Sequence, residues 1–372
     1  MQRFFIITLV AVLLLSFSFS SMATDLSEQD QLGILPESAL VPHIALLLPL
    51  ESASFGEAAN MVKEGFVTAT QRGEPLPAII RLYSTTDDPL DILITYHQAL
   101  SAGAIFVVGP LTRDGVSAVA SSHFSSVPTL ALNTADSNTN LPPKLYSFGL
   151  QMESEANQLA ELALSSGRSH AIIIGDDSSL SKRLQNAFTL RWQNEIDKTT
   201  ESFLYADNPA VLQQFRNLTG GSNHLVFLAL DLEKSRLLRS YIDPEVPVYA
   251  TSQIFAGTDN FLLNNDLNDI QFLDMPWLLQ PDHPAVMAYR HTSTAKSIEM
   301  ERLYALGIDA FRLLVNLMLP QPIDAISIDG VTGQIRFQLP NQFVRELVAA
   351  QFKSGKIQLI MNSKSIVEDE GQ

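Results

Sequence analysis

Apolar and polar positions alternate in blocks along most of the chain, and the first blocks set the pattern. Residues 43–50 are an almost unbroken apolar run with a proline at position 49, a polar turn covers 51–56, and an amphipathic stretch covers 57–71. This order predicts a strand buried on both faces, a loop at its carboxyl end and a covering helix. Ligands of open α/β sheets sit outside the carboxyl ends of the strands, so loop 51–56 is the first place to look for function.

The same alternation of strand and helix continues as far as residue 132. We expect further strands at 78–83, 104–108 and 127–132, and helices at 89–100 and 112–124. Pro89 falls in the first turn of its helix, and Thr112 is placed to cap the other helix. Consecutive strand–helix units predict a doubly wound parallel sheet, because crossovers between parallel strands are right-handed.

A polar, turn-rich stretch at 133–147 breaks this pattern and indicates a crossover to a second lobe. The alternation then resumes, with helices at 153–164, 179–196, 209–218 and 233–240, and strands at 170–175, 201–205, 224–230 and 246–250. From residue 251 the pattern loosens, before a long helix at 297–319 and late strands at 333–338 and 357–360.

The fold class that this order predicts is α/β, a two-lobe clamshell in which each lobe is a doubly wound, mostly parallel sheet. We expect a discontinuous first lobe made of 43–147 and 251–372. The pattern leaves open whether its last strands cross over to the second lobe. The second lobe is expected at 148–250.

The amino-terminal end has the pattern of an export signal. Arg3 precedes an apolar run over 4–19, and the chain then has the small-x-small form of a cleavage site ending at Ala23. We expect a signal peptide at 1–23, cleaved after Ala23, rather than a retained anchor, because the apolar run is short for a membrane span. A polar tether at 24–42 follows. The mature chain is therefore expected in the periplasm with no membrane anchor.

Composition narrows the classes of function. The chain contains no cysteine, which excludes disulfides, a thiol nucleophile and thiolate metal sites, and also a lipid anchor on a lipobox cysteine. With 40 acidic and 24 basic residues the formal net charge is −16. Such a surface repels nucleic acid and anionic lipid headgroups, but it leaves open a protein partner with a basic patch.

Motifs for catalysis, cofactors or metals are absent. The sequence has no HExxH, GxSxG, Walker loop or GxGxxG, so we expect no enzyme activity, no cofactor and no metal. His43, His170 and His224 begin predicted strands, which is the wrong end of the sheet for a site. Asp176 and Asp177 follow a predicted strand and could meet a cation or an amino group, although two adjacent aspartates at a strand end are more often a helix cap and a solvated charge.

Three further features have two interpretations each. The hydroxyl and amide groups of loops 51–56 and 133–140 could hold a small polar ligand at helix amino termini, or could serve ordinary turn chemistry. Trp277 follows Pro276 in an apolar stretch with no clear helix. It is either a core aromatic or a contact for a partner protein.

Segments spread over residues 43–360 resemble the penicillin-binding-protein activators of the LppC/LpoA type, whose fold is similar to the type I periplasmic binding proteins. The segments are HIALLLPL at 43–50, VVGPL at 107–111, ALN at 131–133, FLDMPWL at 272–278, RLYALGIDA at 302–310 and GVTG at 330–333. The resemblance covers the carboxyl-terminal domain of those proteins. It implies a non-catalytic periplasmic accessory protein that docks on and activates a bifunctional, class A peptidoglycan synthase.

The alternative within the same fold is a periplasmic solute-binding protein for an amino acid or a similar small polar ligand. In such binders the loop after the fourth strand offers serine and threonine to the ligand carboxylate, whereas here Leu132 and Asn133 stand near those positions. Fold similarity makes six residues the candidates for a cleft ligand: Ser52, Ser54, Phe55, Asn133, Thr134 and Ser252.

Overall fold

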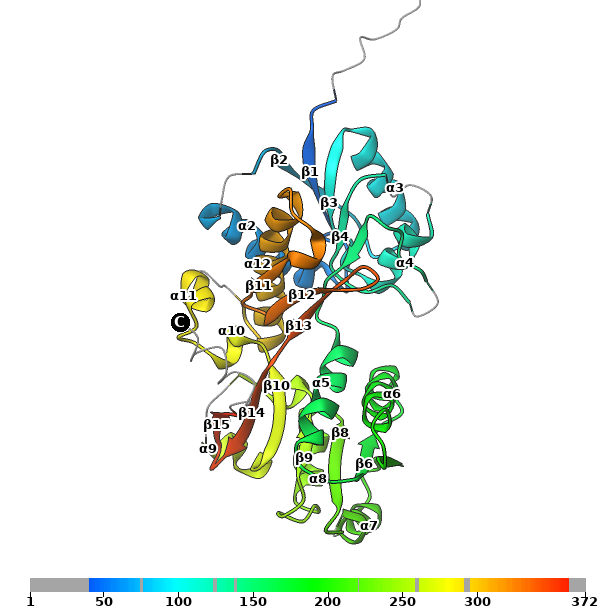
Figure 1. Ribbon diagram of the computed structural model, residues 1–372, viewed down its shortest axis with the longest axis vertical. Helices are drawn as coiled ribbons and strands as arrows, with labels where there is room; N and C mark the ends of the chain where they lie inside the picture. Colours follow the sequence, from blue (N-terminus) through cyan, green and yellow to red (C-terminus); the bar gives the residue numbers. More distant parts are fainter. Residues whose placement is uncertain are drawn as a thin grey trace, which may run out of the picture. The chain divides into compact units, whose positions relative to one another are not determined.

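The computed structural model describes residues 40–73, 76–122, 126–136, 139–219, 221–257, 261–290 and 295–360. The predicted signal peptide at 1–23 and nearly all of the predicted tether at 24–42 lie outside the described residues. The described residues from Pro42 to Ile360 form one unit built around two sheets (Figure 1). None of the helices within the described ranges combines the length and the apolar character that a membrane span requires.

The first sheet has eight strands in the order β11-β12-β13-β5-β4-β3-β1-β2. Their bounds are β1 His43–Leu48, β2 Ile79–Ser84, β3 Ala104–Val108, β4 Thr129–Ala131, β5 Leu145–Ser147, β11 Ser327–Asp329, β12 Gln334–Gln338 and β13 Gln342–Glu346. Strands β1 to β5 and β13 pair in parallel, and only β11 and β12 add antiparallel pairs.

The second sheet has seven strands in the order β15-β14-β10-β9-β8-β6-β7. Their bounds are β6 His170–Gly175, β7 Thr199–Leu204, β8 His224–Ala229, β9 Val248–Ala250, β10 Ile270–Asp274, β14 Val348–Lys353 and β15 Lys356–Leu359. The strands from β6 to β10 pair in parallel, and β14 and β15 add an antiparallel edge. The predicted two-lobe, mostly parallel α/β fold is therefore confirmed.

Helices cover both faces of each sheet, which explains why the central strands are apolar throughout. In β1 the alternate residues Ile44 and Leu46 face α2 (Gly56–Arg72) and α12 (Ile298–Met318), while Ala45 and Leu47 face α3 (Pro89–Ser101) and α4 (Arg113–Ser121). The second sheet is covered by α5 (Met152–Leu164) and α6 (Ser179–Gln193) on one face, and by α7 (Pro209–Thr219) and α8 (Leu232–Arg239) on the other. The short helices are α9 Phe261–Asn264, α10 Pro276–Leu279 and α11 Pro284–Tyr289.

Helix α12 comes late in the chain but belongs to the first lobe, where it packs closely on α2. A Cβ atom added at Gly65 would lie 1.9 Å from the Tyr304 carbonyl oxygen, and one added at Gly307 would lie 2.1 Å from the Val62 carbonyl oxygen. Only glycine permits this approach of the two helix backbones.

The chain passes between the sheets three times: after β5, after β10 and between β13 and β14 (Figure 1). The prediction that it returns to the first lobe at residue 251 is wrong, because β10 pairs with β9 and belongs to the second sheet. Because the segment between β9 and β10 is irregular, the sequence pattern does not predict that these two strands pair. The late strands β14 and β15 also lie in the second sheet.

Candidate functional site

A cavity of about 720 Å³ lies at the carboxyl ends of β8, β9 and β10. Its wall also includes the starts of α5 and α12 and the passage from β13 to β14. Apolar side chains such as Met152, Phe255 and Ile298 alternate there with charged ones. The volume is in the range of small-molecule sites, so the charged groups decide what the cavity can bind.

The buried charges of the cavity are bonded within the protein, and two of them, Arg302 and Asp274, form an ion pair. Arg302 Nη2 lies 2.7 Å from Asp274 Oδ2, and the same nitrogen donates to the Ser252 carbonyl oxygen at 3.0 Å. Ser252 in turn donates its backbone N–H and its hydroxyl to the carboxyl group of Glu155, the hydroxyl at 3.0 Å. These groups need no ligand to satisfy them.

Glu155 has the most perturbed carboxyl group of the cavity. Burial raises the pKa of Glu155 to about 7, and the negative charge of Asp274 raises it as well. The hydrogen bonds from Ser252 and the charge of Arg302 act in the opposite direction. The side chain therefore changes its protonation near neutral pH.

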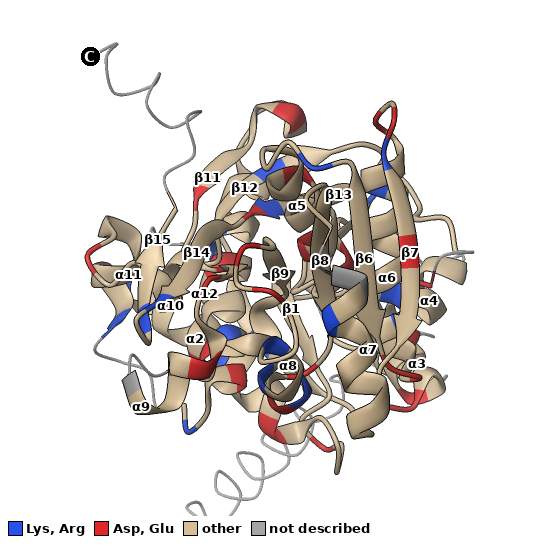
Figure 2. Ribbon diagram, turned by 90° about the horizontal axis from the view of Figure 1, so that it is seen from below, with Lys and Arg blue, Asp and Glu red and all other residues tan. Residues whose placement is uncertain are grey.

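Beside the cavity, the ammonium group of Lys234 lies between two carboxylates, one of which, Asp231, is in the cavity lining. Lys234 Nζ lies 2.6 Å from Asp176 Oδ2 and 2.8 Å from Asp231 Oδ2, and these carboxylates raise the pKa of Lys234. Asp177, the other half of the predicted aspartate pair, lies 3.3 Å from Lys182. Figure 2 shows basic and acidic segments side by side at α8. Asp176 thus meets an amino group, as one interpretation of the sequence predicts, but that group belongs to the chain itself.

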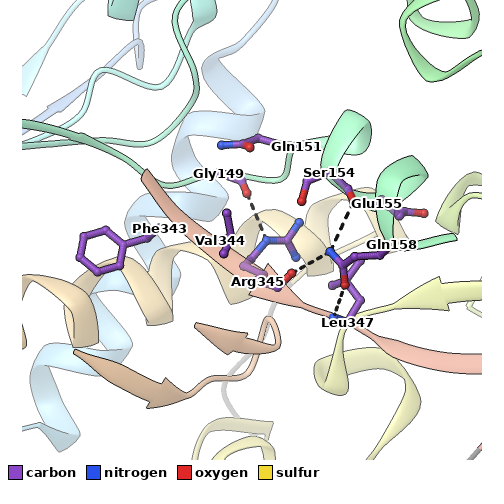
Figure 3. A pocket seen from close by; sticks show the side chains of 9 residues that line it. All are labelled: Gly149, Gln151, Ser154, Glu155, Gln158, Phe343, Val344, Arg345 and Leu347. Atoms are coloured by element: carbon purple, nitrogen blue, oxygen red, sulfur yellow. Dashed lines mark hydrogen bonds between the residues drawn. The ribbon is translucent and has the colours of Figure 1, made fainter. Parts of the chain in front are cut away.

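Next to the cavity, side chains connect the passages between the lobes (Figure 3). Gln158 on α5 donates to the Arg345 carbonyl oxygen at 2.8 Å and accepts from the Leu347 N–H at 2.9 Å. Arg345 Nε donates to the Gly149 carbonyl oxygen at 3.1 Å. Arg345 therefore joins the third passage to the first, Gln158 joins the third passage to α5, and a void of only about 10 Å³ remains there.

Of the six predicted ligand residues, the structure places only Ser252 in the lining of the cavity. Ser52 accepts hydrogen bonds from the backbone N–H groups of Ser54 and Phe55, at 3.2 and 3.0 Å. Phe55 itself is exposed at the start of α2. These contacts match the turn alternative for loop 51–56.

The second predicted loop is also used by the chain itself. Asn133 Nδ2 donates to the Leu111 carbonyl oxygen at 2.9 Å, and Asn133 Oδ1 accepts from the Thr134 N–H at 2.9 Å. Neither residue is in the lining of the cavity.

Trp277 is a core residue, which corrects its candidacy as a partner contact. Its side chain is only 4% exposed, and its Nε1 donates to Glu301 Oε2 at 2.6 Å. Its ring lies 5.6 Å from that of Tyr304.

Four largely buried charged residues of the cavity lining are not predicted from the sequence: Glu155, Asp274, Arg302 and Arg345. Asp274 and Arg302 stand in two of the segments that resemble the activator family, but nothing in their spacing indicates that they meet. In the part of the chain that the structure describes, no group of three or more His, Asp or Glu residues is placed to hold a metal ion.

Two solved structures define the class of protein. One, "Structure of a putative branched-chain amino acid ABC transporter" from Chromobacterium violaceum, is 36% identical with a TM-score of 0.71, over 84% of this chain and 99% of that one. Another, the "LpoA (YraM) C-domain from Haemophilus influenzae, a regulator of PBP1A", is 24% identical with a TM-score of 0.73, over 86% and 100%. The fold is a two-lobe, periplasmic-binding-protein-like fold.

The family follows from the sequence comparison. The family model "LppC putative lipoprotein" matches residues 37–223 and 222–355, and the chain belongs to this LppC family. The penicillin-binding protein activator LpoA of Photobacterium profundum is 26% identical over 359 residues, covering 86% of this chain and 57% of that protein. The chain thus spans about half the length of the curated relatives that it matches. The predicted resemblance to their carboxyl-terminal domain is confirmed.

Proposed function

We propose that the chain is a non-catalytic accessory protein of the periplasm that docks on a bifunctional, class A peptidoglycan synthase and activates it. The observation that carries this proposal is the LppC match over nearly all of residues 37–355, together with relatives named penicillin-binding protein activators. The export-like pattern of residues 1–23 supports the location.

Activation by docking requires a surface whose contacts differ between two states of the synthase. A partner shifts such an equilibrium only by its differential affinity for the two states. The accessory protein then needs a well-defined surface, and it needs no catalytic group and no bound cofactor.

A solute-binding role is the second candidate, because of the 36% identity to the Chromobacterium violaceum protein over nearly its whole length. The cavity does not favour it. An amino acid ligand needs a cationic donor for its carboxylate, but both arginines of the lining are already bonded: Arg302 to Asp274, and Arg345 to the Gly149 and Thr332 carbonyl oxygens. Asp231, one of the lining carboxylates, is already paired with Lys234.

The test is direct binding of the purified protein to a purified class A penicillin-binding protein, measured by calorimetry at moderate salt. Saturable binding at micromolar affinity or better supports the activator role, and glycan polymerisation and cross-linking assays with and without the protein then measure activation. An absence of binding, with a thermal shift on addition of an amino acid or a wall fragment, would favour the solute-binding role.

A further inference from the structure

The loops that follow β1 and β2 lie side by side at the carboxyl edge of the first sheet, where β2 is the edge strand. The loop after β1 and the loop after β2 are joined where the Glu51 N–H donates to the Thr85 carbonyl oxygen at 3.0 Å. With the starts of α2 and α3 they expose a set of side chains that we term the first-lobe edge. Its members are Glu51, Phe55, Glu57, Asp87, Asp88 and Leu90.

Hydrogen bonds of the backbone hold the apolar members of the first-lobe edge, Phe55 and Leu90, in place. Phe55 is 43% exposed, and the buried Ser52 fixes its loop by accepting from the Phe55 N–H at 3.0 Å. The Gly56 N–H then donates to the Ser52 carbonyl oxygen at 2.9 Å, closing the turn into α2. An aromatic side chain on an ordered loop loses little entropy on binding, which is typical of the residues that dominate protein interfaces.

Leu90 is presented in the same way on α3. It is 65% exposed, and its N–H donates to Asp88 Oδ1 at 2.8 Å. Ile94, one turn further along, is exposed on the same outward face, whereas Ile92 and Tyr96 are buried against the sheet. The helix therefore has apolar residues on both its inner and its outer face, and nothing among the described residues covers the outer one.

The charged members of the first-lobe edge are all acidic, and none forms an ion pair with another described residue. Within the described ranges, no Lys, Arg or His lies within salt-bridge distance of Glu51, Glu57, Asp87 or Asp88. Residues 49–62 and 82–112 contain no Lys or Arg at all. Apolar anchors with an acidic surround are complementary to a basic surface with an apolar hollow.

We propose that the first-lobe edge is the docking surface for the class A synthase, and that it meets a Lys- and Arg-rich area of the synthase with a hollow for Phe55. This inference rests on the proposed function. A second copy of this chain and an anionic membrane are disfavoured as occupants, because both would place like charges against these carboxylates.

Calorimetry of the purified protein with a purified class A synthase tests the apolar anchors. Phe55→Ala is expected to weaken binding by at least about tenfold, and Leu90→Ala by about threefold or more. Leu190→Ala on α6 is the matched control, since Leu190 is also 65% exposed, and it should bind like the unmodified protein. All three side chains are at the surface, so thermal melts should confirm that the variants fold.

A charge reversal tests the acidic surround. Asp87→Lys should weaken binding and reduce its dependence on salt concentration, because one attractive charge becomes repulsive. Asp177→Lys, at an exposed position of the second lobe, should change neither.

The outcomes separate the two proposals. If the unmodified protein does not bind, the proposed function fails. If it binds but Phe55→Ala, Leu90→Ala and Asp87→Lys bind equally well, the docking surface is wrong and the proposed function stands. Self-association of the unmodified protein in sedimentation experiments, lost in Phe55→Ala, would instead assign the edge to a second copy of the chain.

Discussion

The carboxyl edges of the two sheets both carry acidic loops, but only one of them neutralises its charges. In the second lobe Lys234 lies between Asp176 and Asp231. In the first lobe the carboxylates of Glu51 and Asp87 have no ion pair within the described residues, and they stand beside exposed apolar side chains. The two similar α/β halves thus differ in how the loops at their carboxyl edges carry charge.

The difference shows that paired carboxylates and unpaired ones can serve different purposes, the first for stability and the second for binding a partner. A carboxylate that is paired internally contributes to the folded state and is closed to an ionic ligand. An unpaired carboxylate at the surface contributes little to folding, but it attracts a partner of opposite charge and sets its orientation. Substitutions on the second-lobe side should therefore change stability, and those on the first-lobe edge should change binding.

The largest expected effect is the loss of the buried ion pair beside the cavity. Arg302→Met leaves Asp274 buried without its partner, and should lower the free energy of unfolding by about 3–5 kcal/mol. Urea denaturation measures this. Lys182→Met is the control, because its pair with Asp177 is exposed and should contribute less than about 1 kcal/mol. If the two variants lose the same free energy of unfolding, the buried pair contributes no more than the exposed one, which would contradict this account.

The next effect concerns pH. The pKa of Glu155 is raised from 4.5 to about 7 in the folded protein, so the folded state keeps a proton that the unfolded state loses. This group should make stability fall as pH rises from about 4.5 to about 7, by as much as about 3 kcal/mol, and then level off. Urea denaturation between pH 5 and pH 8 measures this fall in stability, and it should be absent in Glu155→Gln. Parallel pH profiles for the two proteins would contradict it.

A smaller effect sharpens the contrast between the lobes. Lys234→Met leaves Asp176 and Asp231 without their ammonium group and should cost about 1 kcal/mol of stability, since the site is partly exposed. The variant should also gain a thermal shift with a simple alkylammonium salt that the unmodified protein lacks. An identical response of both proteins to the salt would show that Lys234 does not occupy an ammonium site.

A stability effect of similar size, with no effect on docking, is expected at the predicted loop after β4. Replacing Asn133 and Thr134 with alanine should cost about 1 kcal/mol, because the hydrogen bond from Asn133 to the Leu111 carbonyl is lost. Binding to the synthase should not change, since the loop is not part of the first-lobe edge. If the unmodified protein binds an amino acid and the double variant has lost that binding, this loop holds a ligand after all.

The sequence pattern predicts the regular part of this fold well. Strands such as β1 and β6, buried on both faces, read as continuous apolar runs, and the helices between them carry capping residues such as Thr112 and Ser178. The return to the first lobe is harder to locate, because β10 follows an irregular segment and pairs through tertiary contacts.

The candidate sites are less accessible to sequence reasoning. Arg302 and Asp274 are 28 residues apart and meet only in the folded protein. Serine and asparagine in loops serve turns and ligands through the same hydrogen bonds, so Ser52 and Asn133 are ambiguous until their partners are known. Phe55 is predicted for the cleft, but its exposure next to unpaired carboxylates points to a protein partner.

The most direct measurement is calorimetric titration of a class A penicillin-binding protein with the unmodified chain, at low and at high salt. The account predicts saturable binding that weakens as salt increases, because an acidic edge meets a basic surface. Saturable binding that is indifferent to salt would contradict the first-lobe edge as the contact. An absence of binding at either salt concentration would contradict the central claim that the chain docks on the synthase.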